Sequence, residues 1–181
     1  MNRQITLTCN EFTIIQLRTA TTSDQENLRI WKNSHRTSFF YQEIIQPEQQ
    51  MRWFEKYQNR PDDCMFMVEE LCQEKGKDVF CSIGCMAFRI EDENTIDLYN
   101  IIRGEQSKGK ASMKDAMHMM LAYIWEMFPD KRIKCDVLKE NPAVKWYQKC
   151  GFDIWEEKEY YIMGIDKTDI PTIHIMIDEE E

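Results

Sequence analysis

The sequence predicts a mixed α+β fold, and three observations lead to that prediction. Stretches rich in β-forming residues alternate with stretches of helical periodicity in the order β-α-α-β-β-β-α-β-α-β-β. Apolar residues make up 43% of the chain and charged residues 30%, as in globular proteins. No linker, repeat or low-complexity block separates the elements, so the chain is expected to form one domain spanning residues 1–181.

One strand and two helices are expected first. Residues 12–18 are rich in β-formers and predict a strand. Ser23 and Glu26 have the spacing of a capping box, which predicts a helix beginning beside them. Pro47 suits the first turn of a second helix, because a missing N–H costs nothing there, and Pro61 lies beyond that helix.

The middle of the chain predicts three strands and one long helix. Residues 64–70 and 79–90 predict strands joined by a charged turn, and a second turn leads to a strand over 95–102. Pro129 ends the long helix, whose methionine-rich apolar face is expected to fill the core. The apolar residues that recur at steps of three and four in this helix are Met113, Ala116, Met117, Met120, Leu121, Ile124 and Phe128.

The C-terminal part predicts a short capped helix among strands. Strands are expected over 132–138, 153–165 and 172–178. Between the first two, Asn141 is a good N-cap, and Gly151 can take the left-handed conformation that closes a helix. Four residues of this helix share one face: Ala143, Trp146, Tyr147 and Cys150.

Charge and cysteine content exclude several classes of function. The net charge of −9 argues against a nucleic-acid partner; it suits a cationic amine by long-range steering, or it only maintains solubility. No apolar run approaches the ~20 residues that span a membrane. The seven scattered cysteines include no C-x-x-C pair, which predicts reduced thiols, a cytoplasmic protein and no metal site.

A basic turn, R-G-E-Q-S-K-G-K-A-S over residues 103–112, enters the long helix. Such a turn aims unpaired backbone N–H groups at one point, where the helix dipole favours an anion. Gly109 lets the backbone approach a phosphate, and Ala111 is the next smallest choice. Lys108 and Lys110 concentrate positive charge in an otherwise acidic chain, so the turn is a candidate pyrophosphate cradle.

Two segments resemble motifs of the GCN5-related N-acetyltransferase (GNAT) superfamily. The window Q-S-K-G-K-A over 106–111 resembles its Q/R-x-x-G-x-G/A coenzyme A signature, with Ala111 where many relatives have Gly. The segment N-P-A-V-K-W-Y-Q-K-C-G-F over 141–152 resembles its N…A…Y-x-K-x-G-F segment. A Trp31-x-Asn33 pattern resembles the subgroups that acetylate nucleotide-linked amino sugars or ribosomal protein N-termini.

The resemblance implies a three-layer fold with about four helices and a twisted, mixed, seven-stranded sheet. Its fourth and fifth strands, here 95–102 and 132–138, splay apart, and the pantetheine arm of acetyl-CoA lies between them. The residues expected to bind acetyl-CoA are Ile101, Ile102, Arg103, Gln106, Lys108, Gly109, Lys110, Ala111 and Asn141.

The implied activity is direct, acetyl-CoA-dependent acetylation of a primary amine by a monomer or homodimer. The acceptor is a small molecule, such as a nucleotide-linked amino sugar, or a protein N-terminus. The alternative is a non-catalytic acyl-CoA-binding or protein-interaction module of the same fold.

The resemblance also implies catalytic roles. Tyr147 is expected to protonate the departing sulfur, since a phenol is protonated at neutral pH. Asp97 and Tyr99 share one face of their strand; Asp97 is the first candidate for the base, and Tyr99 is expected to contact the acceptor. His35 is a second candidate for the base. Trp31 and His35 are also expected to bind substrate.

Other nucleophiles and histidines receive structural interpretations. Cys81 and Cys150 would serve a ping-pong mechanism, but neither has a recognisable partner in the sequence. His118 on the long helix and His174 near the end are expected to be structural.

Overall fold

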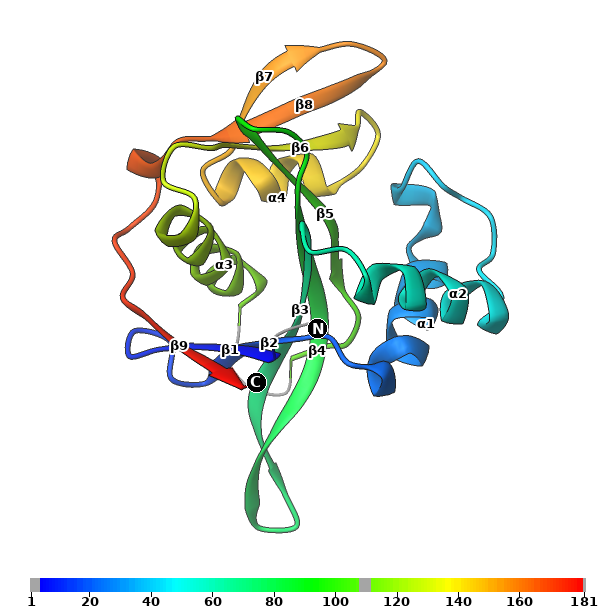
Figure 1. Ribbon diagram of the computed structural model, residues 1–181, viewed down its shortest axis with the longest axis vertical. Helices are drawn as coiled ribbons and strands as arrows, with labels where there is room; N and C mark the ends of the chain where they lie inside the picture. Colours follow the sequence, from blue (N-terminus) through cyan, green and yellow to red (C-terminus); the bar gives the residue numbers. More distant parts are fainter. Residues whose placement is uncertain (1–3, 108–111, 181) are drawn as a thin grey trace.

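The computed structural model describes residues 4–107 and 112–180, and in these ranges nine strands form one twisted sheet (Figure 1). The strand order is β7-β8-β6-β5-β4-β3-β2-β1-β9, and among these described strands only β5 and β6 pair in parallel. The strands are β1 (Gln4–Cys9), β2 (Ile15–Thr19), β3 (Asp63–Glu74), β4 (Lys77–Ile90), β5 (Thr95–Arg103), β6 (Arg132–Leu138), β7 (Asp153–Glu157), β8 (Tyr160–Ile165) and β9 (Ile175–Glu180).

The expected number of seven strands is therefore wrong by two. The first extra strand is β1, which has alternating burial and pairs with β2 and β9. The second arises because residues 153–165 are not one strand. They turn at Lys158, whose backbone N–H donates to the carbonyl of Tyr160, and so form the antiparallel pair β7 and β8.

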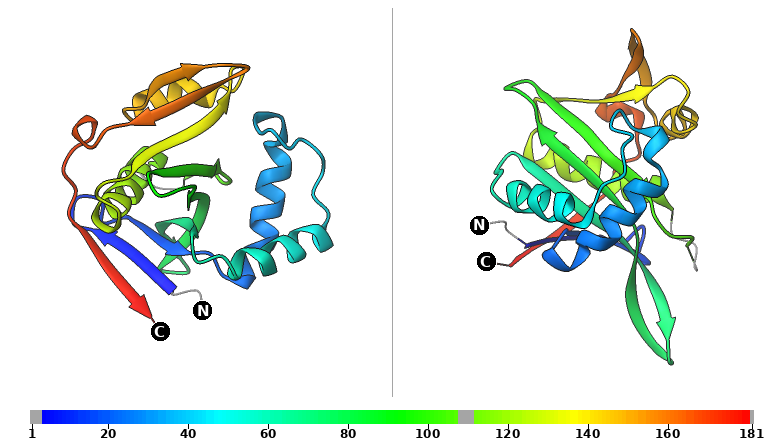
Figure 2. Two further views of the ribbon diagram at one scale, coloured as in Figure 1. Left: turned by 45° about the horizontal axis from the view of Figure 1, so that its top comes forward. Right: turned by 90° about the vertical axis from the view of Figure 1, so that its right-hand side faces the viewer.

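Helices cover both faces of the sheet and make three layers (Figures 1 and 2). One face carries α3 (Met113–Met127) and α4 (Ala143–Lys149), and their apolar residues belong to the larger core cluster. The other face carries α1 (Gln25–Ser34) and α2 (Pro47–Gln58), and a smaller cluster lies beneath them. None of the helices in the described ranges is long and apolar enough to cross a membrane.

The long helix α3 places its methionine-rich face in the core as predicted, and it is buried over more of its surface than that one face. Met117, Met120 and Ile124 are fully buried, and the helix ends one residue before Phe128. His118 is also buried, and its Nε2 lies 3.2 Å from the carbonyl oxygen of Cys150. The structural interpretation of His118 fits this position.

The start of α1 differs from the predicted capping box of Ser23 and Glu26. The carboxylate of Asp24 instead accepts the backbone N–H of Thr21 at 2.7 Å, within a short 3₁₀ turn that precedes the helix. Asp24 is fixed there because the guanidinium of Arg18, on β2, donates to it at 2.7 Å. Glu26 pairs with Arg29 on the helix surface and takes no part in the cap.

Strands β5 and β6 splay apart, as the resemblance implies. They pair only from Thr95 with Arg132 to Asp97 with Lys134, although β5 continues to Arg103 and β6 to Leu138. Beyond the last pair, β6 has a partner in β8 and β5 has a partner in β4. Within the described residues, the facing edges of β5 and β6 therefore lack a neighbouring strand and leave backbone groups for a ligand.

Candidate functional site

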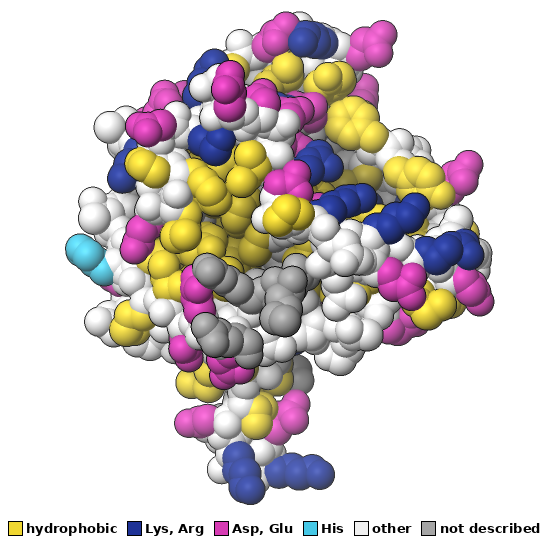
Figure 3. Space-filling model, in the orientation of Figure 1, with side chains coloured by type: hydrophobic (Ala, Val, Ile, Leu, Met, Phe, Trp, Pro, Cys, Tyr) yellow, Lys and Arg dark blue, Asp and Glu magenta, His cyan; other side chains and the backbone are white. Residues whose placement is uncertain are grey.

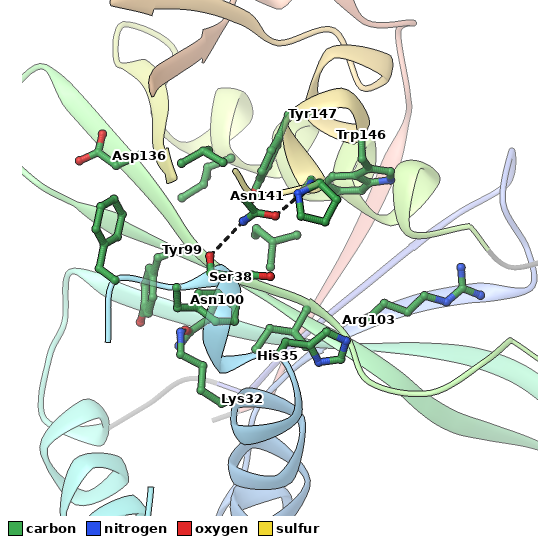
Figure 4. Close-up of a pocket in the computed structure, with 18 of the residues that line it drawn as sticks. Lys32, His35, Ser38, Tyr99, Asn100, Arg103, Asp136, Asn141, Trp146 and Tyr147 are labelled. Atoms are coloured by element: carbon green, nitrogen blue, oxygen red, sulfur yellow. Dashed lines mark hydrogen bonds between the residues drawn. The ribbon is translucent and has the colours of Figure 1, made fainter. Parts of the chain in front are cut away.

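A cavity of about 590 Å³ occupies the wedge between β5 and β6. Its walls come from β5, from α4, and from α1 with the segment that follows it (Figure 4). This volume lies within the usual range for small-molecule sites. Figure 3 shows a hollow lined by hydrophobic side chains near the centre of the face, with Lys and Arg side chains gathered on its right.

A β-bulge reshapes β5 where it lines the cavity. Ala87 pairs with Tyr99 and Cys85 pairs with Ile102, so two residues of β5 oppose one residue of β4. Asn100, the first of these two residues, has φ 48°, a left-handed value that asparagine tolerates better than most residues. Ile101 and Ile102 both line the cavity, although the Ile102 side chain is buried under α1.

Tyr147 lies on the wall of this cavity, where the short helix α4 faces β5 (Figure 4). Its ring contacts Trp146 and Phe152 in edge-to-face geometry. Burial raises the pKa of the Tyr147 phenol well above its usual value of 10.0. Tyr147 is therefore a protonated hydroxyl at neutral pH, as a proton donor must be.

Asp97 lines the same cavity at the last paired position of β5 and β6. Its carboxylate accepts a hydrogen bond from Arg89 at 2.9 Å, and the Nζ of Lys134 lies 3.6 Å away. Burial raises the pKa of Asp97, and the charges of Lys134 and Arg89 oppose that rise. The carboxylate is thus at the cavity, but two cations already neutralise it.

Tyr99 and His35 also line the cavity, and each has a bond to the protein. The Tyr99 hydroxyl donates to the buried carboxylate of Asp63. Burial, together with the charge of Asp63, raises the pKa of Tyr99 well above its usual value. His35 ends α1, and its Nδ1 lies 2.9 Å from the carbonyl oxygen of Trp31. Both residues lie in the cavity wall, and their contact with an acceptor stays a prediction.

Trp31 has a different environment from the one expected of a substrate-binding residue. Its side chain is 2% exposed and is not part of the cavity wall. The indole N–H donates to Glu105 at 3.1 Å, and Gly104 packs on the ring. Asn33 exchanges two hydrogen bonds with the backbone of Ile45, at 3.0 and 2.8 Å. The Trp31-x-Asn33 pattern therefore positions two loops, and direct contact of Trp31 with substrate has no support in this arrangement.

The basic turn is described only in part, because Lys108, Gly109, Lys110 and Ala111 lie outside the described residues. Arg103 lines the cavity and is exposed, and Gln106 is exposed beside it. The Ser107 hydroxyl donates to the carboxylate of Glu70. Beyond the turn, the Ser112 hydroxyl accepts the backbone N–H of Lys114 at 3.1 Å and caps α3.

Asn141 uses both ends of its amide (Figure 4). Its Oδ1 accepts the backbone N–H of Ala143 at 2.8 Å, which caps the first turn of α4 as predicted. Its Nδ2 donates to the carbonyl oxygen of Ser38 at 3.0 Å. Asn141 lines the cavity and links α4 to the segment after α1, so it is well placed to couple the two walls.

The structure adds Lys32, Asn100 and Arg89 to the candidate residues. The ammonium of Lys32 donates to Oδ1 of Asn100 at 2.6 Å and lies 3.2 Å from the ring centre of Phe39. Two signals in the sequence point to this pair. Lys32 follows Leu28 by four residues and so shares the buried face of α1, and asparagine is rare inside strands.

A second cavity of about 450 Å³ continues from the first, beneath α1 and α2. Six of the described residues line both cavities, among them Lys32, Arg89 and Tyr99. The two cavities together extend from Tyr147 in the wedge to Trp53 on α2. This continuity gives the site room for two ligands side by side.

The model of the acetyltransferase (GNAT) domain matches residues 15–153 of this chain. No curated protein matches the sequence. Among solved structures, spermidine N-acetyltransferase from Vibrio cholerae, in complex with CoA and spermine, is similar over 87% of this chain and 98% of that chain, with a TM-score of 0.68 and 18% identity. The N-acetyltransferase PseH from Campylobacter jejuni is similar over 85% and 99%, with a TM-score of 0.59 and 18% identity. FdhC, a nucleotide-linked sugar GNAT, is similar over 83% and 85%, with a TM-score of 0.60 and 17% identity.

Proposed function

The chain belongs to the acetyltransferase (GNAT) family, and we propose that it transfers an acetyl group directly from acetyl-CoA to the primary amine of an acceptor. The observation that carries this proposal is the meeting of two groups at one cavity. Tyr147 and Asp97 both line the wedge between β5 and β6, where an acid and a base are needed.

The wedge fits the extended arm of acetyl-CoA. In the part of the chain that the structure describes, the edge of β5 beyond Asp97 has no strand beside it on the β6 side, so its backbone can bond the amides of pantetheine as a strand would. Ile101, Ile102 and Arg103 belong to this part of β5. We assign the pyrophosphate to residues 103–111 and the start of α3, where Gln106 and the expected lysines bring donors, and a further contact to Asn141.

The transfer balances without a further reactant. The carbon–sulfur bond of the thioester breaks and a carbon–nitrogen bond forms, while the amine loses one proton and the sulfur gains one. Asp97 takes the proton of the amine, directly or through water. Tyr147 gives a proton to the sulfur; its high pKa keeps the proton on the phenol until sulfur carries negative charge.

The acceptor in this proposal is a small molecule, for which a nucleotide-linked amino sugar is one candidate, or a protein N-terminus. The similar structures include enzymes with spermidine and with nucleotide-linked sugar in their names, so the fold leaves both chemistries open. The second cavity, next to Asp97 and Tyr99, is the space for this acceptor.

Titration calorimetry with acetyl-CoA, followed by a screen of primary amines, tests the proposal. We expect saturable binding of acetyl-CoA, release of free CoA thiol with at least one amine, and a product heavier by one acetyl group in mass spectrometry. Binding of acetyl-CoA without thiol release from any amine would favour the non-catalytic alternative. Absence of acetyl-CoA binding would contradict both.

A further inference from the structure

We propose that the second cavity binds an anionic group of the acceptor, a phosphate or a carboxylate, and that Lys32 is its principal partner. This inference rests on the proposed function, because it describes the molecule whose amine is acetylated. It assigns to the acceptor a property that the acetyl-transfer chemistry does not require.

The charges that line the second cavity are all of one sign. Lys32, Arg60 and Arg89 contribute to its wall, and no described carboxylate does. The protein as a whole has a net charge of −9, so this concentration of cations opposes the general trend of the surface. A wall with an unpaired cation attracts anions and repels a polyamine, so what matters is which of these three cations is unpaired.

The two arginines already have carboxylate partners outside the cavity. Arg60 donates to Asp63 at 3.2 Å, and Arg89 donates to Asp97 at 2.9 Å. Lys32 differs, because no described carboxylate lies within 4.0 Å of its ammonium; its polar partner is the neutral side chain of Asn100. A substrate anion would supply the missing countercharge.

The position of Lys32 connects this anion to the reaction. Lys32 lines both cavities, as do Tyr99 and Asn100 of β5. An acceptor that places its anion at Lys32 in the second cavity can therefore direct its amine toward Asp97 in the first. The aromatic side chains of Trp53 and Tyr41 also line the second cavity and offer apolar surface for the body of such a molecule.

The first test measures binding to the free protein near neutral pH, without acetyl-CoA. We compare glucosamine 6-phosphate with glucosamine, alanine with alaninamide, and spermidine, by titration calorimetry. In at least one of the first two pairs, the compound with the anion should bind at least about tenfold more tightly than the compound without it. The pair with the larger difference in affinity shows whether the cavity prefers phosphate or carboxylate. Spermidine should bind more weakly than either anionic amine. If neither anionic amine binds better than its partner that lacks the anion, the proposal is wrong.

Three variants separate the charge of Lys32 from its volume. Lys32→Met should lose about tenfold or more in affinity for the preferred anionic amine, and Lys32→Arg should retain most of it. Lys158→Met removes an exposed lysine that pairs with Glu156 in the hairpin of β7 and β8, and should change nothing. Equal affinity in Lys32→Met and the parent protein, with both folded by circular dichroism, would overturn the assignment.

A pH series with glucose 6-phosphate, which has no amine, adds an independent readout. Burial lowers the pKa of Lys32 to about 8 in the free protein, so affinity should fall as the pH rises above that value in the parent and stay level in Lys32→Arg. The other titratable groups in the described walls of the two cavities that Lys32 lines are Cys85, Arg89, Tyr99, Tyr41, Arg60, His35, Asp97, Arg103, Asp136 and Tyr147. Burial raises the pKa of Cys85 to about 12 and that of Tyr99 further, so both stay neutral through the series.

Failure of this inference and failure of the proposed function have different signatures. Acetylation of amines with no preference for an anion would leave the proposed function intact and refute the role of Lys32. Anion binding that depends on Lys32, without acetylation of any amine, would support the role of Lys32 and refute the proposed function.

Discussion

Gly104 packs against the indole of Trp31 so closely that a Cβ atom at Gly104 would lie 2.0 Å from the ring. The backbone N–H groups of Gly104 and Glu105 both donate to the carbonyl oxygen of Ile83 at 2.9 Å, and Glu105 accepts the indole N–H at 3.1 Å. The start of the basic turn is thus held between α1 and β4. A helix on one face of the sheet thereby positions the segment that leads to the expected cofactor cradle.

Gly104→Ala should destabilise the protein by about 1–3 kcal/mol, because the indole of Trp31 is buried and cannot move away freely. The free energy of unfolding in urea measures this cost, and calorimetry should show weaker binding of acetyl-CoA. Trp31→Phe puts a smaller ring beside residue 104 and so relieves the overlap with the new methyl group. The double variant should therefore lose less stability than the sum of the losses in the two single variants. Parental stability in Gly104→Ala would contradict the contact.

Sequence reasoning predicted most elements of the fold because their signals are local. Helix periodicity, caps and turn residues placed α3 and α4 within two residues of their observed bounds, and Pro47 marked the start of α2. The site is harder, because its pairs come from distant parts of the chain. Tyr99 bonds Asp63, 36 residues away, and Lys32 bonds Asn100, 68 residues away. A local pattern specifies neither pair; only the sheet register and the position of α1 bring them together.

The unfolding free energy of Lys32→Met relative to the parent should depend on pH. Burial lowers the pKa of Lys32 from 10.5 to about 8, so below about pH 8 the folded state carries the cost of a buried charge. Between those two values the unfolded chain binds more protons than the folded chain, and the parent gains stability as the pH rises. The variant lacks this gain. The variant should therefore be more stable than the parent by about 1–3 kcal/mol below pH 8, and this difference in unfolding free energy should shrink toward pH 10.5.

Urea unfolding of both proteins across this pH range measures the difference. Titratable groups other than Lys32 are present in both proteins, so their contributions cancel in the difference of unfolding free energies. The change of that difference with pH is therefore due to Lys32. A difference that is constant with pH would mean that the ammonium is well solvated in the folded state.

Two variants of Asn141 should separate its cap from its bond to Ser38. Asn141→Ala loses both and should cost about 1–2 kcal/mol of stability. Asn141→Asp keeps an oxygen for the N–H of Ala143 and so retains the cap, but it has no donor for the carbonyl of Ser38; it should therefore lose less stability than Asn141→Ala. Hydrogen exchange should nevertheless speed up around residues 36–41 in both variants. Protection of that segment in Asn141→Asp would show that the bond to Ser38 is unimportant.

Incubation with radiolabelled acetyl-CoA alone should leave no stable label on a cysteine. Burial raises the pKa of Cys85 and of Cys150 to about 12, and that of Cys135 well above 9.0. These thiols are therefore protonated near neutral pH and poor nucleophiles. A stoichiometric label that disappears when one cysteine is changed to serine would replace direct transfer with an acyl-enzyme mechanism.

Tyr147→Phe should lower the turnover rate by roughly 10- to 1000-fold while acetyl-CoA affinity is largely retained. The variant keeps the ring that packs between Trp146 and Phe152 and removes only the proton donor. The Tyr147 hydroxyl makes no hydrogen bond to a described residue, so the free energy of unfolding should change little. Stopped-flow or single-turnover measurement is needed, because the loss appears only where chemistry limits the rate.

Tyr57→Phe is the matched control. The Tyr57 ring is 2% exposed, its hydroxyl accepts the backbone N–H of Met65 at 2.8 Å, and it lines neither cavity. Removing that hydroxyl leaves a buried N–H unpaired and should cost about 1–3 kcal/mol of stability, with parental turnover in the folded enzyme. The two variants should thus show opposite patterns: Tyr147→Phe loses rate and keeps stability, and Tyr57→Phe loses stability and keeps rate. Parental turnover in a folded Tyr147→Phe protein would mean that Tyr147 only packs beside Trp146 and Phe152, and that the sulfur takes its proton from another donor.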